Sequence, residues 1–142
     1  MRVLTVPRLL EDLLASGRWP RDAREAMAQN LKPRVTSERV QKLAPEESTI
    51  YLLPPPFQTI REESKGSPFW TWTMAAPDGI DFDLAIDIGD FGIGSDAPIL
   101  LDYREDAVNP RVIRLLWSAS GKENKWVVMA PDFRTFVEVL GL

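Results

Sequence analysis

Closely spaced aspartates and glycines between residues 78 and 106 are the part of this chain that could do chemistry. Paired carboxylates such as Asp87 and Asp90 could share a proton in acid–base catalysis, but the glycines beside them favour a turn with positive φ. Asp90-Phe91-Gly92 copies a metal-binding triplet of protein kinases, yet the histidine of a kinase catalytic loop is missing. Asp81-Phe82-Asp83 lacks the other ligands of a calcium loop. These motifs therefore do not predict a catalytic centre.

The chain has no histidine and no cysteine. This excludes a histidine general base, serine–histidine and cysteine–histidine nucleophiles and the usual zinc sites. Carboxylate pairs, a lysine or tyrosine base, and oxygen-ligated Mg²⁺ or Ca²⁺ stay open. The lack of cysteine agrees with a reducing compartment, and residues Met1 to Pro7 lack the apolar core of a secretory signal. We therefore expect a cytoplasmic protein that needs no cofactor and no resident metal.

Charge is distributed unevenly along the chain, whose formal net charge is −4. The segment from Asp78 to Asp106 carries nine acidic residues and one basic residue, Arg104, which gives −8 and leaves +4 for the rest. An acidic segment disfavours nucleic acid, because binding to phosphates depends on Lys and Arg. The segment can be turns that face water, or an acidic patch that attracts a basic protein.

The first 45 residues predict helices. Leu9, Leu10, Leu13 and Leu14 have the spacing of an amphipathic helix over 6–15, which Gly17 ends. Further helices are predicted over 21–30 and over 37–43, the latter with Thr36 or Ser37 as N-cap. No apolar run approaches the roughly 18 residues of a membrane-spanning helix, so we expect no membrane partner.

The middle of the chain predicts a short buried strand over 49–53, which the prolines Pro54 to Pro56 end. Residues 57–64 predict a helix and 65–68 a loop. If 69–72 is a strand, Trp70 and Trp72 lie on one face, because side chains two apart point the same way. An exposed pair would be a binding hot spot, but packing in the core is favoured because large aromatic residues are mostly buried.

From Asp87 onward the pattern indicates a glycine- and aspartate-rich turn before a strand that ends in Leu101-Asp102. Strands follow over 111–117 and 125–130, and an amphipathic helix closes the chain over 131–142. Together these elements predict a single α+β domain over 1–142. Residues 1–45 form a helical N-terminal extension or a subregion of this domain, and 46–142 form a mostly antiparallel sheet with helices packed against it.

The succession IGDFGIGSDAPILLDYR, RVIRLLW and KWVVMAPDFRTFVEVLGL resembles the SUKH superfamily, over roughly the last 40% of the chain. Members are similar in the glycine–aspartate turn, the Leu101-Asp102 pair and the DFxxF-like start of the closing helix at Asp132. The first 45 residues are unlike the short proline-led helix that usually opens the family's domain. The resemblance implies an α+β domain without enzymatic activity. Many bacterial members are implicated as immunity proteins that neutralise toxins, often nucleases.

We therefore expect a non-enzymatic protein-binding domain that neutralises a basic toxin through an acidic surface. Asp102 is expected to be structural, with its carboxylate capping nearby backbone N–H groups. The candidate contact residues, for each of which ordinary turn or core packing is the alternative, are Asp81, Asp83, Asp90, Asp96, Glu105, Asp106, Trp70 and Trp72.

Two other functions stay open. A regulatory or scaffold module could bind an endogenous protein through Trp70, Trp72 or the three prolines. A Mg²⁺-dependent hydrolase could use the aspartates between Asp81 and Asp102, although they form no recognisable set of ligands.

Overall fold

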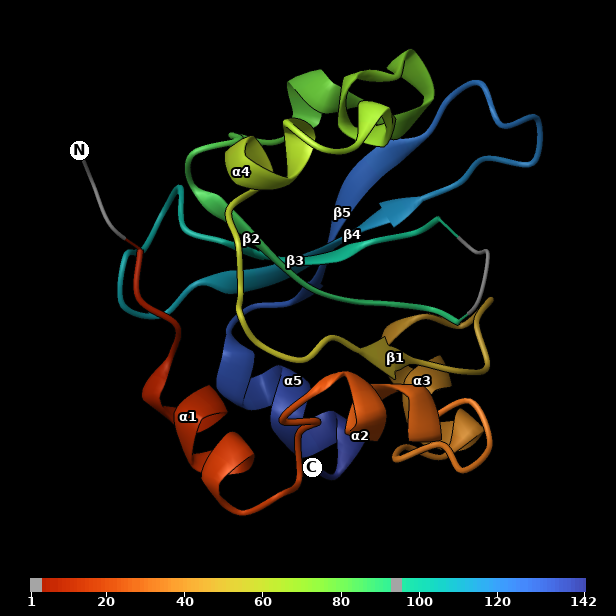
Figure 1. Cartoon of the computed structure of the whole chain (residues 1–142). Helices are drawn as coiled ribbons and strands as arrows, with labels where there is room; N and C mark the ends of the chain where they lie inside the picture. Colours follow the sequence, from red (N-terminus) through yellow and green to blue (C-terminus); the bar gives the residue numbers. More distant parts are fainter. Residues whose placement is uncertain (1–3, 93–95) are drawn as a thin grey trace.

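An antiparallel meander forms the centre of the molecule (Figure 1). The computed structural model describes residues 4–92 and 96–142, and within these ranges the sheet has five strands in the order β1-β2-β3-β4-β5. The strands are β1 (Tyr51–Leu52), β2 (Ala85–Asp90), β3 (Ile99–Asp102), β4 (Arg111–Leu116) and β5 (Lys125–Ala130). The helices are α1 (Arg8–Ala15), α2 (Ala23–Ala28), α3 (Ser37–Leu43), α4 (Ile60–Ser64) and α5 (Phe133–Leu140). The α+β prediction, with an antiparallel sheet and a closing helix, is confirmed.

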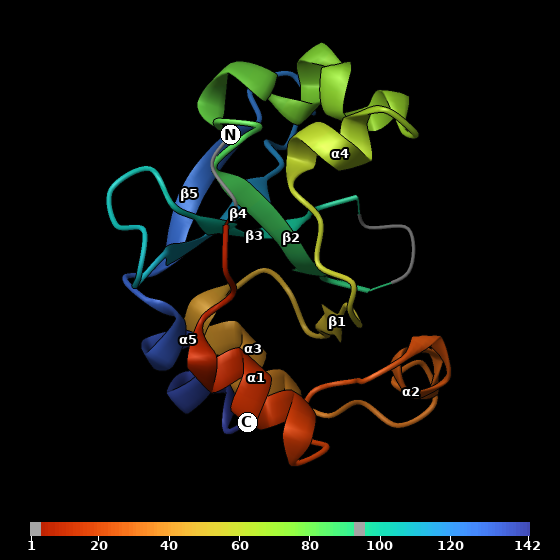
Figure 2. The ribbon, with the colours of Figure 1, turned by 60° about the vertical axis from the view of Figure 1, so that its left-hand side comes forward.

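One face of the sheet is covered by α1, α3 and α5, which stack together below it, while α2 lies beyond β1 (Figure 2). Leu10 of α1, Val40 of α3 and Phe136 of α5 are fully buried in one core with the strands. Because burial of such side chains contributes about 2 kcal/mol each, the N-terminal helices are integral to the fold. They share its main core and do not form a separate extension.

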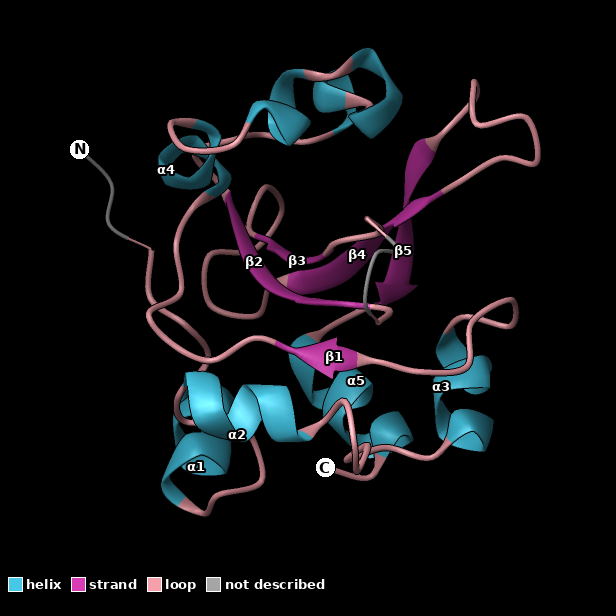
Figure 3. Ribbon diagram, turned by 45° about the vertical axis from the view of Figure 1, so that its right-hand side comes forward, coloured by secondary structure: helices cyan, strands magenta, loops and turns pink. Residues whose placement is uncertain are grey.

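The other face is covered by α4 and by 3₁₀ helices over Pro68–Thr71, Thr73–Ala75 and Pro77–Gly79. Ile60 and Trp70 from this layer pack on Leu100 and Ile113 of the sheet. The sheet therefore lies between two helical layers, and each layer forms its own hydrophobic core with one face of the sheet (Figure 3).

Local capping explains where several helices begin and end. The Thr36 side chain accepts the Arg39 N–H, so α3 matches the predicted range 37–43. Asp132 caps α5 by accepting the Thr135 N–H at 2.7 Å. Helix α4 begins at Ile60, three residues after the predicted start, because Thr59 and Glu62 form a capping box there.

The structure differs from the strand considered over 69–72 and from the turn predicted from Asp87. Residues 68–71 form a 3₁₀ helix and no strand, because Pro68 suits the first position of a helix and cannot donate to a sheet. The turn predicted to start at Asp87 starts later, because strand β2 continues to Asp90. Part of that predicted turn, residues 93–95, lies outside the described residues, as do residues 1–3 of the segment considered for a signal.

The glycines near Asp90 have different roles. Gly92 has φ +114°, which confirms the predicted positive φ at one position. Gly89 lies in strand β2, where a Cβ would come within 2.9 Å of the Tyr51 carbonyl oxygen. Gly89 therefore allows β1 to approach β2 closely.

Candidate binding site

A hollow of about 590 Å³ lies between α4, the 3₁₀ helix over Pro68–Thr71 and the edge of β2 and β3. We call it the acidic hollow. It is lined by the carboxylates Glu62, Glu63, Asp87, Asp90 and Asp96, and by Gln58, Gly66, Ser67, Phe69, Trp70 and Pro98. None of the described residues that line it carries a positive charge. Five acidic side chains from three parts of the sequence thus face one space.

Aromatic side chains form part of the wall of the acidic hollow. Trp70 is buried, meets Phe69 edge to face with ring centroids 5.1 Å apart, and stacks on Trp126 of β5. The prediction that Trp70 packs in the core is confirmed. Aromatic faces and carboxylates both attract guanidinium and ammonium groups. Their combination in one wall therefore favours a positively charged group as the ligand.

Glu63 and Asp87 form a pair of carboxyl groups that do not both ionise readily. Burial raises the pKa of Asp87 well above its ordinary value, and the neighbouring Glu63 raises it further by its charge and its hydrogen bond. Burial also raises the pKa of Glu63, although hydrogen bonds to Asp87 and Trp70 oppose the shift. Burial and mutual repulsion thus oppose ionisation of both groups together, and a positive charge that enters the hollow would favour their ionised forms.

Asp90 is the last residue of β2, and Asp96 is the first described residue after positions 93–95. The Asp90 Oδ1 atom accepts the N–H of Phe91 at 2.6 Å and the N–H of Ala97 at 3.2 Å. Asp96 is exposed with φ +48°, and its carbonyl accepts the Trp117 indole N–H at 3.0 Å. Both predicted contact residues therefore line the acidic hollow, and Asp90 also holds the backbone N–H groups of two residues that are six positions apart.

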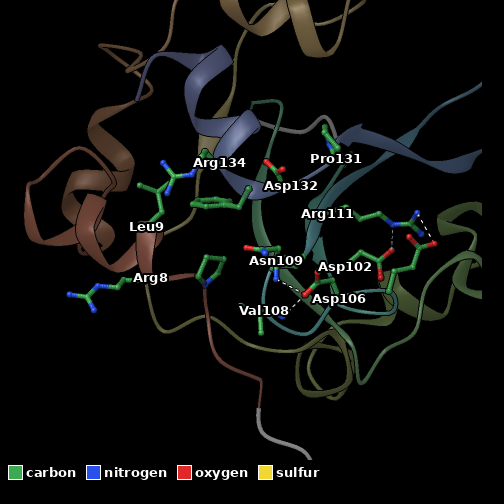
Figure 4. Close-up of a pocket in the computed structure, with 14 residues that line it drawn as sticks. Arg8, Leu9, Asp102, Asp106, Val108, Asn109, Arg111, Pro131, Asp132 and Arg134 are labelled. Carbon is green, nitrogen blue, oxygen red and sulfur yellow. Dashed lines mark hydrogen bonds and ion pairs between the residues drawn. The ribbon is translucent and has the colours of Figure 1, made fainter.

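Glu105 and Asp106 line a different hollow, a groove of about 770 Å³ between the start of α1, the loop after β3 and the start of α5 (Figure 4). This groove also contains Arg8, Arg111 and Arg134, so its charge is mixed. Asp106 accepts the N–H groups of Val108 and Asn109 at 2.8 Å, and these bonds lower its pKa. Ordinary turn chemistry thus accounts for Asp106.

Asp102 lies at the base of the same groove with its side chain fully buried. It accepts the Arg104 backbone N–H, as predicted, but it also accepts both guanidinium groups of Arg104 and Arg111, at 2.9 and 2.8 Å. Burial alone would raise the pKa of Asp102, and the two arginines outweigh burial and lower it. The role of Asp102 is structural.

Asp81 and Asp83 lie outside both hollows. The Asp83 carboxylate pairs with Arg61 at 3.1 Å, and the Asp81 carboxylate accepts the Asp83 N–H at 2.9 Å. Arg61 in turn lies over the Phe82 ring. These contacts compensate the charge of Asp83, so the predicted acidic set is divided among separate places on the surface.

The condition under which Trp70 and Trp72 would share a face is not met, and the core packing favoured for the pair holds for Trp70 but not for Trp72. A 3₁₀ helix has three residues per turn, so residues two apart point in different directions. Trp70 is buried, whereas Trp72 is 47% exposed and lies beside Met74 in a shallow surface hollow.

Sequence reasoning missed Glu62 and Glu63 as members of the site. They precede the start of the acidic segment at Asp78 by 16 and 15 positions, and α4 brings them to β2 through the bridge between Thr59 and Ile86. No local pattern signals this approach, since it depends on how the connection after β1 returns across the sheet.

The described residues contain no group of three or more acidic side chains placed to hold a metal ion. In the same part of the chain, no helix has the length and apolar character needed to cross a bilayer. Comparison with protein-family models, curated proteins and solved structures found no match. The resemblance to the SUKH superfamily therefore stays a prediction.

Proposed function

We propose that this chain is a non-enzymatic protein-binding domain that binds a basic protein partner through the acidic hollow. The observation that carries the proposal is the convergence of five carboxylates on a space whose described lining has no cation. Acidic groups that line a concave surface attract a partner of opposite charge and speed its encounter.

The chemistry of the hollow favours an arginine or lysine side chain of the partner. A guanidinium can pair with two carboxylates and stack on an aromatic face. Asp96 and Glu62 lie toward solvent, while Trp70 and Asp87 lie deeper. A long basic side chain that enters the hollow would meet exposed charges first and the aromatic wall afterwards.

The resemblance to the SUKH superfamily extends this proposal to an immunity protein that acts in the cytoplasm on a cognate toxin. A nuclease that cleaves nucleic acid needs a basic cleft, because its substrate is a polyanion. An acidic hollow that occupies such a cleft would compete with the substrate. The proposal includes neither nucleic acid nor a membrane as partner.

The test is a pull-down from the native cell with the full chain as bait, together with co-purification of the protein encoded by the adjacent gene. We expect a basic protein that is retained by wild type and lost by the double variant Glu63→Gln/Asp96→Asn. The control variant Glu138→Gln removes an exposed charge from α5 on the opposite layer and should retain it. A captured partner that binds the double variant as well as wild type would contradict the proposal.

The exposure of Trp72 supports a second candidate function, a scaffold or regulatory module that binds an endogenous protein. Trp72 and Met74 are each about half exposed on the 3₁₀ layer, and exposed tryptophans are frequent hot spots of interfaces. Loss of the captured partner in Trp72→Ala, with retention in Glu63→Gln/Asp96→Asn, would favour this function over the acidic hollow.

A further inference from the structure

The two edge strands of the sheet, β1 and β5, differ in how their outward backbone N–H and C=O groups are covered. At the β1 edge, the Gln29 side chain donates to the Leu52 carbonyl at 2.9 Å and accepts the Leu52 N–H at 3.0 Å. The buried amide of Gln29 thus takes the place of a neighbouring strand. The Trp19 indole N–H donates to the next carbonyl, that of Leu53, at 2.7 Å. The β1 edge is short and is sealed by side chains.

The opposite edge, β5, has backbone groups that point away from the sheet. The Leu115 N–H donates to the Pro98 carbonyl, so the backbone N–H and C=O groups of Leu115 point toward β3. The backbone groups of its neighbours Arg114 and Leu116 therefore point toward β5. Their partners on β5 are Val127 and Lys125. Because backbone groups alternate along an antiparallel strand, the N–H and C=O groups of Trp126 and Val128 point outward.

These outward groups make no hydrogen bond to any described residue of the chain. Natural proteins commonly protect an edge strand with proline, with inward charges, with a β-bulge or with a covering segment. Strand β5 carries a single charged residue, Lys125 at its start, and it contains no proline. Its register irregularity against β4 falls at Met129, after the two residues whose backbone groups point outward. In Figure 3 it forms the outer margin of the sheet.

An apolar surface adjoins this open edge. The Val128 side chain is 54% exposed on β5. The strand is joined to the 3₁₀ layer by the Asn124 side chain, which donates to the Met74 carbonyl at 2.8 Å, and by the Trp126 indole, which donates to the Ala75 carbonyl. The exposed side chains of Trp72 and Met74 therefore belong to the segment that flanks β5.

We propose that β5 pairs antiparallel with β5 of a second copy of this chain and continues the sheet across a two-fold axis. An extended backbone is the partner that satisfies alternating outward N–H and C=O groups. With Trp126 of one copy opposite Val128 of the other, both strands contribute the same pair of residues, as a two-fold axis requires.

The position of the charged residue favours a second copy in this orientation. In the antiparallel pair each Lys125 lies opposite Met129, so the two lysines are about 13 Å apart along the strands. This separation exceeds the screening length of roughly 8–10 Å at physiological salt. A parallel pair would place the lysines side by side. The proposed dimer leaves the acidic hollow unused and is independent of its function.

Sedimentation velocity of the full chain over the micromolar range tests the dimer. We expect a concentration-dependent species of twice the 16.1 kDa mass of one chain. Val128→Lys should weaken self-association at least about tenfold. Leu31→Lys, which replaces a fully exposed apolar residue beyond α2, should leave it unchanged. Wild type that stays monomeric, or Val128→Lys that dimerises like wild type, would overturn the proposal.

Hydrogen exchange on the wild-type chain provides a readout that does not depend on a variant. The amides of Trp126 and Val128 should exchange more slowly as the protein concentration rises, because pairing covers them. Equal exchange at low and high concentration would exclude pairing along β5, even if Val128→Lys failed to fold.

Discussion

Asp87 and Asp102 lie on the adjacent strands β2 and β3, yet their surroundings have opposite effects on their carboxyl groups. Asp102 accepts two guanidinium groups, which lower its pKa against the effect of burial. Asp87 meets Glu63, and burial and this neighbour raise its pKa. The first carboxylate stabilises the fold when ionised, while the second reduces stability when ionised.

Replacing Asp102 by Asn is expected to lower the free energy of unfolding by about 3 kcal/mol at neutral pH, because Arg104 and Arg111 lose a buried partner. The pKa of Asp102 is lower in the folded chain than in the unfolded chain, where it is near 4. The stabilisation that ionised Asp102 provides is therefore present above about pH 4 and is lost as the pH falls below that value. Urea unfolding at several pH values measures both effects. Asp106→Asn, at an exposed turn, should change stability by about 0.5 kcal/mol or less, and equal effects of the two variants would contradict the role of Asp102.

Replacing Asp87 by Asn is expected to raise the free energy of unfolding by about 1 kcal/mol at pH 8. A raised pKa means that the folded chain binds more protons than the unfolded chain above pH 4, so wild-type stability falls as the pH rises through this window. The variant should show a smaller fall between pH 5 and pH 8 in thermal unfolding. Asp78→Asn removes the same charge from an exposed turn. If its pH profile changed as much as that of Asp87→Asn, the pairing with Glu63 would be refuted.

Among the secondary-structure elements, α2 has a specific role at the sheet. Its end positions the Gln29 amide on both backbone groups of Leu52, a buried residue of β1. Strand β1 is only two residues long and is followed by three prolines. The Gln29 side chain therefore makes the backbone hydrogen bonds that a neighbouring strand would make at a longer edge.

Removing this side chain tests the role of α2. Gln29→Ala should lower the free energy of unfolding by about 2 kcal/mol, because it leaves a buried donor and acceptor without partners. Asn30→Ala, at the next and exposed position, should stay within about 0.5 kcal/mol of wild type. Chemical denaturation gives both values, and hydrogen exchange should locate the loss of protection at Leu52. Full protection of Leu52 in Gln29→Ala would show that another group seals the edge.

Elements with local signals were predictable from the sequence. Helix α3 follows from Thr36 as N-cap, and α5 follows from Asp132 and the apolar spacing after it. Strand predictions over 111–117 and 125–130 also hold within a residue. The alternating tryptophans over 69–72 are compatible with a strand, but Pro68 starts a 3₁₀ helix there.

The acidic hollow was predictable only in part. Asp90 and Asp96 belong to a segment in which the aspartates and glycines predict a turn, so the sequence offers both as candidates. Glu63 pairs with Asp87 only because α4 packs over β2, and this packing leaves no local trace in the sequence. The charge of Asp83 makes it a candidate contact residue in the sequence. In the fold, however, α4 places Arg61 beside Asp83, and the two form an ion pair.

For the whole molecule, the fold distributes one acidic segment between structural contacts and the lining of the acidic hollow. The −8 segment from Asp78 to Asp106 supplies Asp102 and Asp106 to local structure and Asp83 to an ion pair. Asp87, Asp90 and Asp96 join two glutamates in the acidic hollow. The hollow and the open β5 edge are separate surfaces, so a dimer could bind one partner on each copy.

The most direct test of the acidic hollow is the affinity of the captured basic partner measured by calorimetry over a series of salt concentrations. We expect the affinity of wild type to fall steeply with salt, and the affinity of Glu63→Gln/Asp96→Asn to be lower by at least about tenfold at low salt with a shallower dependence. Glu138→Gln should match wild type. An affinity that is independent of salt, or equal in wild type and the double variant, would contradict binding through the acidic hollow.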